Sequence, residues 1–184
     1  MKISFFYKVI LFFCTAILGM SLTGIAQVVL PTYPDSIFTT YYHQRYSLFK
    51  SLPDSKRDII FLGNSINDGS EWAELFNDVR IKNRGISGDI TTGILHRLKE
   101  VTSRKPAKVF LMIGINDLGR GVSPDSVVKN ILLINDYILQ ESPSTKVYIE
   151  SILPVNASFG KFPGQVSKGV QVLRSNELLK AAAL

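Results

Sequence analysis

Three short loops of the sequence carry groups that acyl transfer uses. Ser65 lies in a Gly-Asn-Ser-Ile turn, where a hydroxyl that stands clear of the backbone can act as a nucleophile. Gly88 offers a backbone N–H that no side chain shields, and Asn116 offers an amide N–H₂ group. Together with the N–H of Ser65, these groups can donate hydrogen bonds to a developing oxyanion. The loops therefore predict a serine hydrolase centre.

Each loop taken singly also has a plain structural interpretation. Gly-Asn-Ser is a common turn, Gly85 and Gly88 suit a strand-to-helix turn with Asp89 as helix cap, and Asn116-Asp117 is a good turn pair. The functional interpretation depends on finding all three in order, each after a predicted strand. A nucleotide site is disfavoured, because the sequence has no Gly-x-Gly-x-x-Gly opening a helix and no Walker lysine.

The loops follow short apolar runs that are typical of buried parallel strands. The predicted strands are 58–62, 79–83, 107–113 and 146–153. Amphipathic helices are predicted over 72–76, 90–101, 124–140 and 170–184, and an aromatic helix through 41–49. We expect Asp35 or Ser36 to cap the aromatic helix and Ser123 to cap the helix that opens with Pro124. This alternation predicts an α/β fold with a mostly parallel sheet, whose ligands bind at the carboxyl ends of the strands.

The first 26 residues have the pattern of a secretory signal peptide. Lys2 and Lys8 form a basic start, an apolar run follows over 9–22, and small residues precede a predicted cleavage after Ala26. The alternative is a membrane anchor, which the shortness of the run disfavours because a spanning helix needs roughly 20 apolar residues. Cleavage would remove Cys14, the only cysteine, and leave no disulfide or thiolate metal site. We expect a secreted or periplasmic protein without a stable membrane anchor.

The overall composition fits a single globular domain of ordinary polarity. Of 184 residues, 46% are hydrophobic and 20% are charged, and the net charge of +6 comes from scattered basic residues that alternate with acids. Such scatter favours a solvated surface over a nucleic-acid partner. The sequence gives no sign of a metal or of an organic cofactor, and it is silent on the oligomeric state.

The three loops together resemble the sequence blocks of the SGNH (GDSL-like) hydrolases. Residues 63–66 resemble the first block, whose usual form is Gly-Asp-Ser, with Asn64 in place of the aspartate. Residues 83–89 resemble the second block and 114–117 the third. The similarity extends over about 58–180 and is greatest to bacterial acylhydrolases related to platelet-activating-factor acetylhydrolase catalytic subunits and to sialate O-acetylesterases.

The resemblance implies roles and an architecture that the sequence by itself leaves open. It implies Ser65 as the catalytic nucleophile and Gly88 and Asn116 as oxyanion donors. It also implies a three-layer α/β/α, flavodoxin-like SGNH fold over residues 57–184. Residues 27–56 are then an N-terminal extension that contains a helix. The implied reaction is hydrolysis of a small-molecule or glycan ester, such as an acetyl ester of a carbohydrate.

The family's general base is absent from the place where the resemblance puts it. That base is the histidine of an Asp-x-x-His block near the C-terminus, after a fifth strand, and the two histidines here are His43 and His96. His43 precedes the first predicted strand and His96 lies inside a predicted helix, so both are expected to have packing or surface roles. We therefore expect a C-terminally incomplete domain with impaired hydrolysis. The alternative is a non-catalytic SGNH-fold remnant or a carbohydrate-binding module.

Overall fold

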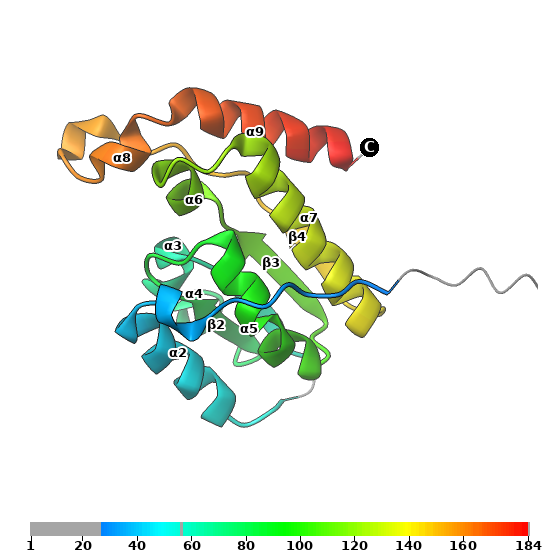
Figure 1. Cartoon of the computed structure of the whole chain (residues 1–184). Coiled ribbons are helices and arrows are strands. Elements are labelled where there is room, and N and C mark those ends of the chain that lie inside the picture. Colours follow the sequence, from blue (N-terminus) through cyan, green and yellow to red (C-terminus); the bar gives the residue numbers. More distant parts are fainter. Residues whose placement is uncertain (1–26, 56, 184) are drawn as a thin grey trace, which may run out of the picture.

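A single parallel sheet organises the computed structural model, which describes residues 27–55 and 57–183. Its strand order is β2-β1-β3-β4 (Figure 1). The strands are β1 (Ile59–Gly63), β2 (Ile81–Gly85), β3 (Lys108–Met112) and β4 (Lys146–Ile149). The helices are α2 (Thr40–Ser51), α3 (Ser65–Asp68), α4 (Trp72–Leu75), α5 (Thr91–Ser103), α6 (Ile115–Gly119), α7 (Pro124–Glu141), α8 (Pro163–Val166) and α9 (Gly169–Ala182), with 3₁₀ turns η1 (Asp35–Ile37) and η2 (Ala157–Phe159). The predicted α/β fold with a parallel sheet flanked by helices is confirmed.

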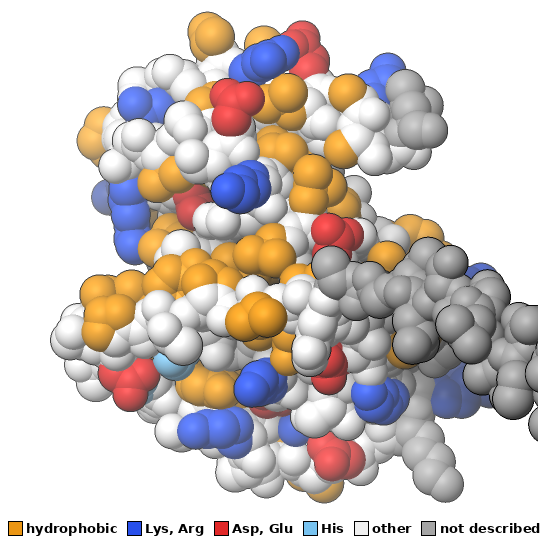
Figure 2. Space-filling model, turned by 45° about the vertical axis from the view of Figure 1, so that its right-hand side comes forward, with side chains coloured by type: hydrophobic (Ala, Val, Ile, Leu, Met, Phe, Trp, Pro, Cys, Tyr) orange, Lys and Arg blue, Asp and Glu red, His pale blue; other side chains and the backbone are white. Residues whose placement is uncertain are grey.

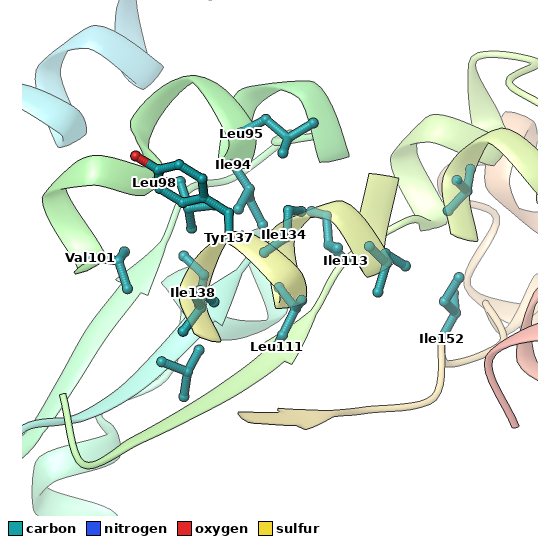
Figure 3. Close-up of a cluster of buried hydrophobic side chains, with 14 of the residues drawn as sticks. Ile94, Leu95, Leu98, Val101, Leu111, Ile113, Ile134, Tyr137, Ile138 and Ile152 are labelled. Carbon is teal, nitrogen blue, oxygen red and sulfur yellow. The ribbon is translucent and has the colours of Figure 1, made fainter. Parts of the chain in front are cut away.

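The hydrophobic core lies between one face of the sheet and the helices α5 and α7. Both helices turn an apolar stripe toward β1 and β3, as their 3.6-residue periodicity predicts. Figure 3 shows the side chains of α5, α7 and β3 meeting in this layer. Ile60, Leu98 and Ile134 are fully buried there. This layer fixes the strands whose carboxyl ends carry the three loops.

The opposite face of the sheet carries a row of stacked aromatic rings. The ring of Phe61 in β1 stacks on Phe110 of β3 at 5.0 Å between centroids, and Phe110 stacks on Tyr148 of β4 at 4.8 Å. Trp72 of α4 covers Phe61 at 4.4 Å. Toward β4 the row becomes open to solvent, and Tyr148 is 42% exposed.

Several predicted boundaries and caps need correction. The aromatic helix begins at Thr40, and its cap is Thr39, whose hydroxyl accepts from the Tyr42 N–H, so Asp35 and Ser36 do not cap it. Asp89, which the plain structural interpretation of the second loop made a cap, does not cap α5. The last strand ends at Ile149 instead of residue 153, because the chain then leaves the sheet. The predicted Ser123 cap of α7 is confirmed, with the hydroxyl accepting from the Ser126 N–H.

The predicted signal peptide with Cys14 lies outside the described residues, and the predicted domain limits stay predictions. Among the helices of residues 27–55 and 57–183, none has the length and apolar character needed to cross a bilayer. On the face shown in Figure 2, Lys and Arg side chains are interspersed with Asp and Glu, and exposed hydrophobic side chains form a band between them.

Candidate active site

The three predicted loops lie at the same edge of the sheet, because they follow neighbouring parallel strands. Ser65 follows β1, Gly88 follows β2 and Asn116 follows β3. Hydrogen bonds join the loops to one another: the Ile86 N–H donates to the Gly63 carbonyl at 3.1 Å, and Asn116 Nδ2 donates to the Asp89 carbonyl at 2.9 Å. The structure thus assembles the loops into one connected platform.

Ser65 is the first residue of α3 and is exposed to solvent. The buried side chain of Asn64 caps this helix by accepting from the Ile66 N–H at 3.1 Å, which an aspartate would also do. The turn is tight: a Cβ on Gly63 would lie 2.2 Å from the Met112 carbonyl oxygen, so only glycine fits there. The close approach of β1 and β3 at this point sets where the hydroxyl of Ser65 stands.

Gly88 lies in the loop between β2 and α5, in a left-handed conformation with φ of 81°. Arg120 Nη2 donates to the Gly88 carbonyl at 3.0 Å and holds the loop from the α6 side. From the α3 side, the N–H and hydroxyl of Ser87 both donate to Asp68 Oδ2, at 2.9 and 2.6 Å. Within the described part of the chain, the N–H groups of Ser65 and Gly88 donate to no other group. Both N–H groups are therefore available to a ligand.

Asn116 has a defined amide orientation. Its Nδ2 donates to the Asp89 carbonyl, and its Oδ1 accepts from Gln165 Nε2 at 3.3 Å. An N–H₂ group has two hydrogens, so one remains for a ligand. Gln165 comes from α8, some 50 residues along the chain, and therefore acts as a positioning residue for this amide.

A cavity of about 540 Å³ opens beside Ser65 and Asn116, and both residues line it. This volume is within the usual range for small-molecule sites. Its apolar lining comprises Ile66, Ile115, Pro154, Val155, Phe159 and Phe162, and its polar lining includes Asn156, Lys161 and Gln165. Gly88 lines a separate, much smaller hollow of about 20 Å³ beside Tyr42 and Arg120. The structure therefore joins Ser65 to Asn116 in one cavity and leaves Gly88 next to it.

Two buried carboxylates, those of Asp89 and Asp117, hold the three loops together through hydrogen bonds. Asp89 accepts from Arg97 Nη2 at 2.9 Å, and the same guanidinium reaches the Gly63 carbonyl at 3.3 Å. Asp117 accepts from the N–H and the hydroxyl of Thr91, at 3.0 and 2.6 Å. Burial raises the pKa of Asp89, an effect that the Arg97 guanidinium opposes, and burial likewise raises the pKa of Asp117. These contacts tie the second and third loops to the first.

Neither histidine lines the cavity with Ser65. His96 Nδ1 lies 2.9 Å from the Tyr42 hydroxyl, and its Nε2 lies 3.1 Å from Asp35 Oδ1. His43 Nε2 lies 3.0 Å from the Asp35 carbonyl. Both rings thus pack between the N-terminal segment and α2 or α5, as expected for structural histidines. The described residues bring no histidine to Ser65.

Sequence reasoning missed several residues that shape the site. Asp68, Arg97 and Gln165 each anchor one of the loops, and Phe159 and Phe162 line the cavity. Arg97 lies in α5 whereas Asp89 precedes that helix, so their spacing of eight is not one that marks a helical side-chain pair. Gln165 and the two phenylalanines carry no sequence signal either, because their position depends on how the chain folds back after β4.

A parallel α/β sheet with a serine turn and an asparagine beside one cavity is the arrangement of an α/β serine hydrolase. The model of the GDSL-like Lipase/Acylhydrolase family matches residues 61–183, and this chain belongs to that family. The resemblance seen in the loop sequences is thereby confirmed.

Curated relatives agree with this membership. The chain is 29% identical over 135 residues to platelet-activating factor acetylhydrolase IB subunit alpha1 of Pongo abelii, covering 70% of this chain and 55% of that protein. It is 31% identical over 136 residues to the alpha2 subunit of Gallus gallus, covering 70% and 56%. The chain therefore spans about half the length of the curated relatives that it matches.

The fold is also that of solved bacterial structures. A GDSL-like lipase of Bacteroides thetaiotaomicron aligns with a TM-score of 0.63 at 24% identity, covering 77% of this chain and 72% of that one. A Bacteroides fragilis protein aligns with a TM-score of 0.64 at 24% identity, covering 83% and 74%. At this identity, the likeness bears on the fold alone.

Proposed function

We propose that this chain is the nucleophile-bearing part of a carboxylic ester hydrolase. Ser65 Oγ attacks the acyl carbonyl carbon, the alcohol leaves, and water then releases the acid from the acyl-serine. The N–H groups of Ser65 and Gly88 and the Asn116 amide donate to the oxyanion in each tetrahedral intermediate. The observation that carries this proposal is the cavity of about 540 Å³ that Ser65 and Asn116 line together.

The cavity also bears on the substrate. Its apolar residues suit the carbon skeleton of an ester, and the side chains of Asn156, Lys161 and Gln165 offer hydrogen bonds to a polar alcohol. A glycan ester has such an alcohol, and the proposal includes it. Neither a metal nor a cofactor has a part in this reaction scheme.

The described residues place no histidine where it could act as a general base for Ser65. A serine hydroxyl without a base is a poor nucleophile, and loss of one triad member typically lowers turnover on the order of 10⁴-fold. Because no histidine of the described residues lines the cavity, we propose that hydrolysis by this chain is slow. The same base is needed to activate water in deacylation, so an acyl-serine would persist once formed.

Persistence of the acyl-serine gives a direct test. The protein is incubated with p-nitrophenyl acetate, and intact-mass spectrometry followed by peptide mapping locates the acetyl group. We expect one acetyl group on Ser65, none there in Ser65→Ala, and labelling of Asn116→Ala slowed about 100- to 1000-fold. Ser70→Ala is the matched control, because Ser70 lies just after α3 and outside the cavity.

Two results would contradict the proposal. Acetylation spread over lysines and serines, and unchanged in Ser65→Ala, would show that Ser65 is not a nucleophile and would favour a non-catalytic module. Fast turnover that depends on Ser65 would show instead that the chain has a base which the described contacts do not include.

We also propose that residues 1–26 direct export and are then removed. The proposal rests on the basic start, the apolar run and the small residues before position 27. Mass spectrometry of the protein recovered from a bacterial periplasm tests it, with an N-terminus at Gln27 as the expected result. An intact Met1 on membrane-bound protein would contradict it.

A further inference from the structure

The candidate nucleophile and the candidate oxyanion glycine come from different elements. Ser65 is the first residue of α3, whereas Gly88 lies in the loop between β2 and α5. Their N–H groups donate to one oxyanion only if the two elements keep a fixed relative position, since a misplacement of about 1 Å can lower a rate about 100-fold. A side chain that spans both elements is therefore a candidate for positioning the oxyanion site.

Asp68 is a side chain that spans these two elements. It ends the short helix α3 that Ser65 begins, and the Gly69 N–H closes this turn by donating to the Ser65 carbonyl at 3.0 Å. Its Oδ2 accepts from the Ser87 N–H at 2.9 Å and from the Ser87 hydroxyl at 2.6 Å. Ser87 directly precedes Gly88 in the chain. One carboxylate thus connects the helix of the nucleophile to the residue beside the oxyanion donor.

Helix α2 holds the Asp68 carboxylate in place. The Tyr41 hydroxyl donates to Asp68 Oδ2 at 2.8 Å, and Arg45 Nη2 lies 3.3 Å from Asp68 Oδ1. The hydrogen bond to the carboxylate raises the pKa of Tyr41, so its hydroxyl keeps the proton that it donates. The side chain of Asp68 is only 6% exposed. Hydrogen bonds to an ionised acceptor are roughly twice as strong as those between neutral groups, so this carboxylate is held firmly.

The same helix also packs directly on the second loop. Tyr42 and Phe49 of α2 form a buried cluster with Ile86, which lies two residues before Gly88. Helix α2 therefore contacts the loop at Ile86 and, through the Asp68 carboxylate, at the next residue along the chain.

We propose that Asp68 is a positioning residue for the oxyanion site. Its carboxylate fixes the turn of Gly88 relative to Ser65, and α2 fixes the carboxylate. This inference rests on the proposed function, in which Ser65 and Gly88 act together in ester hydrolysis. It adds a role for α2, although no described residue of the cavity lining comes from that helix.

A purely structural interpretation is that Asp68 only stabilises the fold by joining α2 to α3. Acylation by p-nitrophenyl acetate and by p-nitrophenyl thionoacetate separates the two interpretations. In the thiono ester the negative charge develops on sulfur, which is a weak hydrogen-bond acceptor, so an oxyanion site favours the oxygen ester. A displaced Gly88 N–H lowers the ratio of the two rates, whereas partial unfolding lowers both rates equally and leaves their ratio unchanged.

The test follows acylation of Ser65 by both esters with intact-mass spectrometry, over a range of ester concentrations. We expect Asp68→Ala to lower the limiting rate with the oxygen ester about 10- to 100-fold and to leave the half-saturating concentration unchanged. The rate with the thiono ester should fall less. Asp68→Asn keeps an oxygen acceptor for Ser87 but turns an amide N–H₂ toward Arg45, so its rate should lie between those of the wild type and Asp68→Ala.

Glu100→Gln is the matched control. Glu100 is also a buried carboxylate, and it pairs with Arg84 and Arg104 instead of with the loops of the site. Its substitution should lower the free energy of unfolding and leave the ratio of oxygen to thiono ester rates at the wild-type value. Circular dichroism is measured on every variant, so that rates are compared only among folded proteins. An unchanged ratio in Asp68→Ala would overturn the positioning role.

A double-mutant cycle tests whether Asp68 acts through Ser87. Ser87→Ala removes the hydroxyl contact and keeps the N–H contact, so it should slow acylation less than Asp68→Ala does. If Asp68 acts through Ser87, the variant Asp68→Ala/Ser87→Ala is no slower than Asp68→Ala alone. Effects that multiply would show that the two residues act independently, and the proposal would be wrong.

A nuclear magnetic resonance spectrum of protein labelled with ¹⁵N-glycine separates failure of this inference from failure of the proposed function. The Gly88 signal is identified by its absence in Gly88→Ala. We expect this signal to move in Asp68→Ala and to keep its wild-type position in Glu100→Gln. If the wild type forms no acyl-serine, the proposed function fails, and the spectrum still decides whether Asp68 fixes the Gly88 turn. A signal that does not move in Asp68→Ala would show that it does not.

Discussion

The pair of Asp89 and Arg97 is the residue-level contact that holds the candidate site together. Arg97 is fully buried, and it joins Asp89 of the second loop to the Gly63 carbonyl of the first. A buried ion pair contributes little relative to apolar residues, but removal of one partner leaves the other charge uncompensated. The pair therefore fixes two loops, and replacement of either residue alone is expected to destabilise the fold.

We predict that Arg97→Met lowers the free energy of unfolding by about 3–5 kcal/mol, because Asp89 is left buried without its cation. Urea denaturation followed by the fluorescence of Trp72 measures this change. Arg80→Met is the control: Arg80 pairs with Asp78 on the exposed surface, and its loss should leave the urea midpoint unchanged. Equal effects of the two substitutions would contradict the structural role of Arg97.

The sequence was sufficient to predict the residues at strand ends, because parallel strands deliver their carboxyl-terminal loops to one edge. Ser65 and Asn116 were found in this way, and their roles stay predictions. Gln165 and Phe162 could not be found, since they reach the cavity through the path of the chain after β4. The plain structural interpretation of the second loop made Asp89 a helix cap, whereas its carboxylate accepts the stronger, charge-assisted hydrogen bond from Arg97.

At the element scale, the start of α2 shows how tertiary contacts decide between neighbouring caps. Asp35, Ser36 and Thr39 are all suitable cap residues, and the sequence does not rank them. Burial of Tyr42 and Phe49 against Ile86 sets the position of the helix. Thr39 is the residue that then stands one position before its first turn.

We predict that Thr39→Ala lowers the free energy of unfolding by about 1 kcal/mol through loss of this cap, whereas Ser36→Ala leaves it unchanged. Thermal or urea unfolding of the two variants under the same conditions measures the difference. A larger loss in Ser36→Ala would show that the helix begins earlier than Thr40.

At the scale of the whole molecule, the helices differ in the fraction of their residues that is buried. Nine of the thirteen residues of α5 are buried, compared with two of the fourteen residues of α9. The apolar stripe of 170–184 predicted a helix correctly, but it could not reveal that α9 packs mainly on α7, outside the sheet (Figure 1). Local opening is easiest where few apolar contacts are lost.

We predict that amide hydrogens of α9 exchange at least about tenfold faster than those of α5, because α9 can open while the sheet and α5 stay folded. Asn176 sharpens the test, since its amide both accepts from the Ile152 N–H at 2.8 Å and donates to the Ile152 carbonyl at 3.0 Å. Asn176→Ala removes both contacts and should accelerate exchange in α9 while leaving α5 unchanged. Exchange of the two helices at one common rate, in the wild type or in this variant, would mean that the molecule opens as a single cooperative unit.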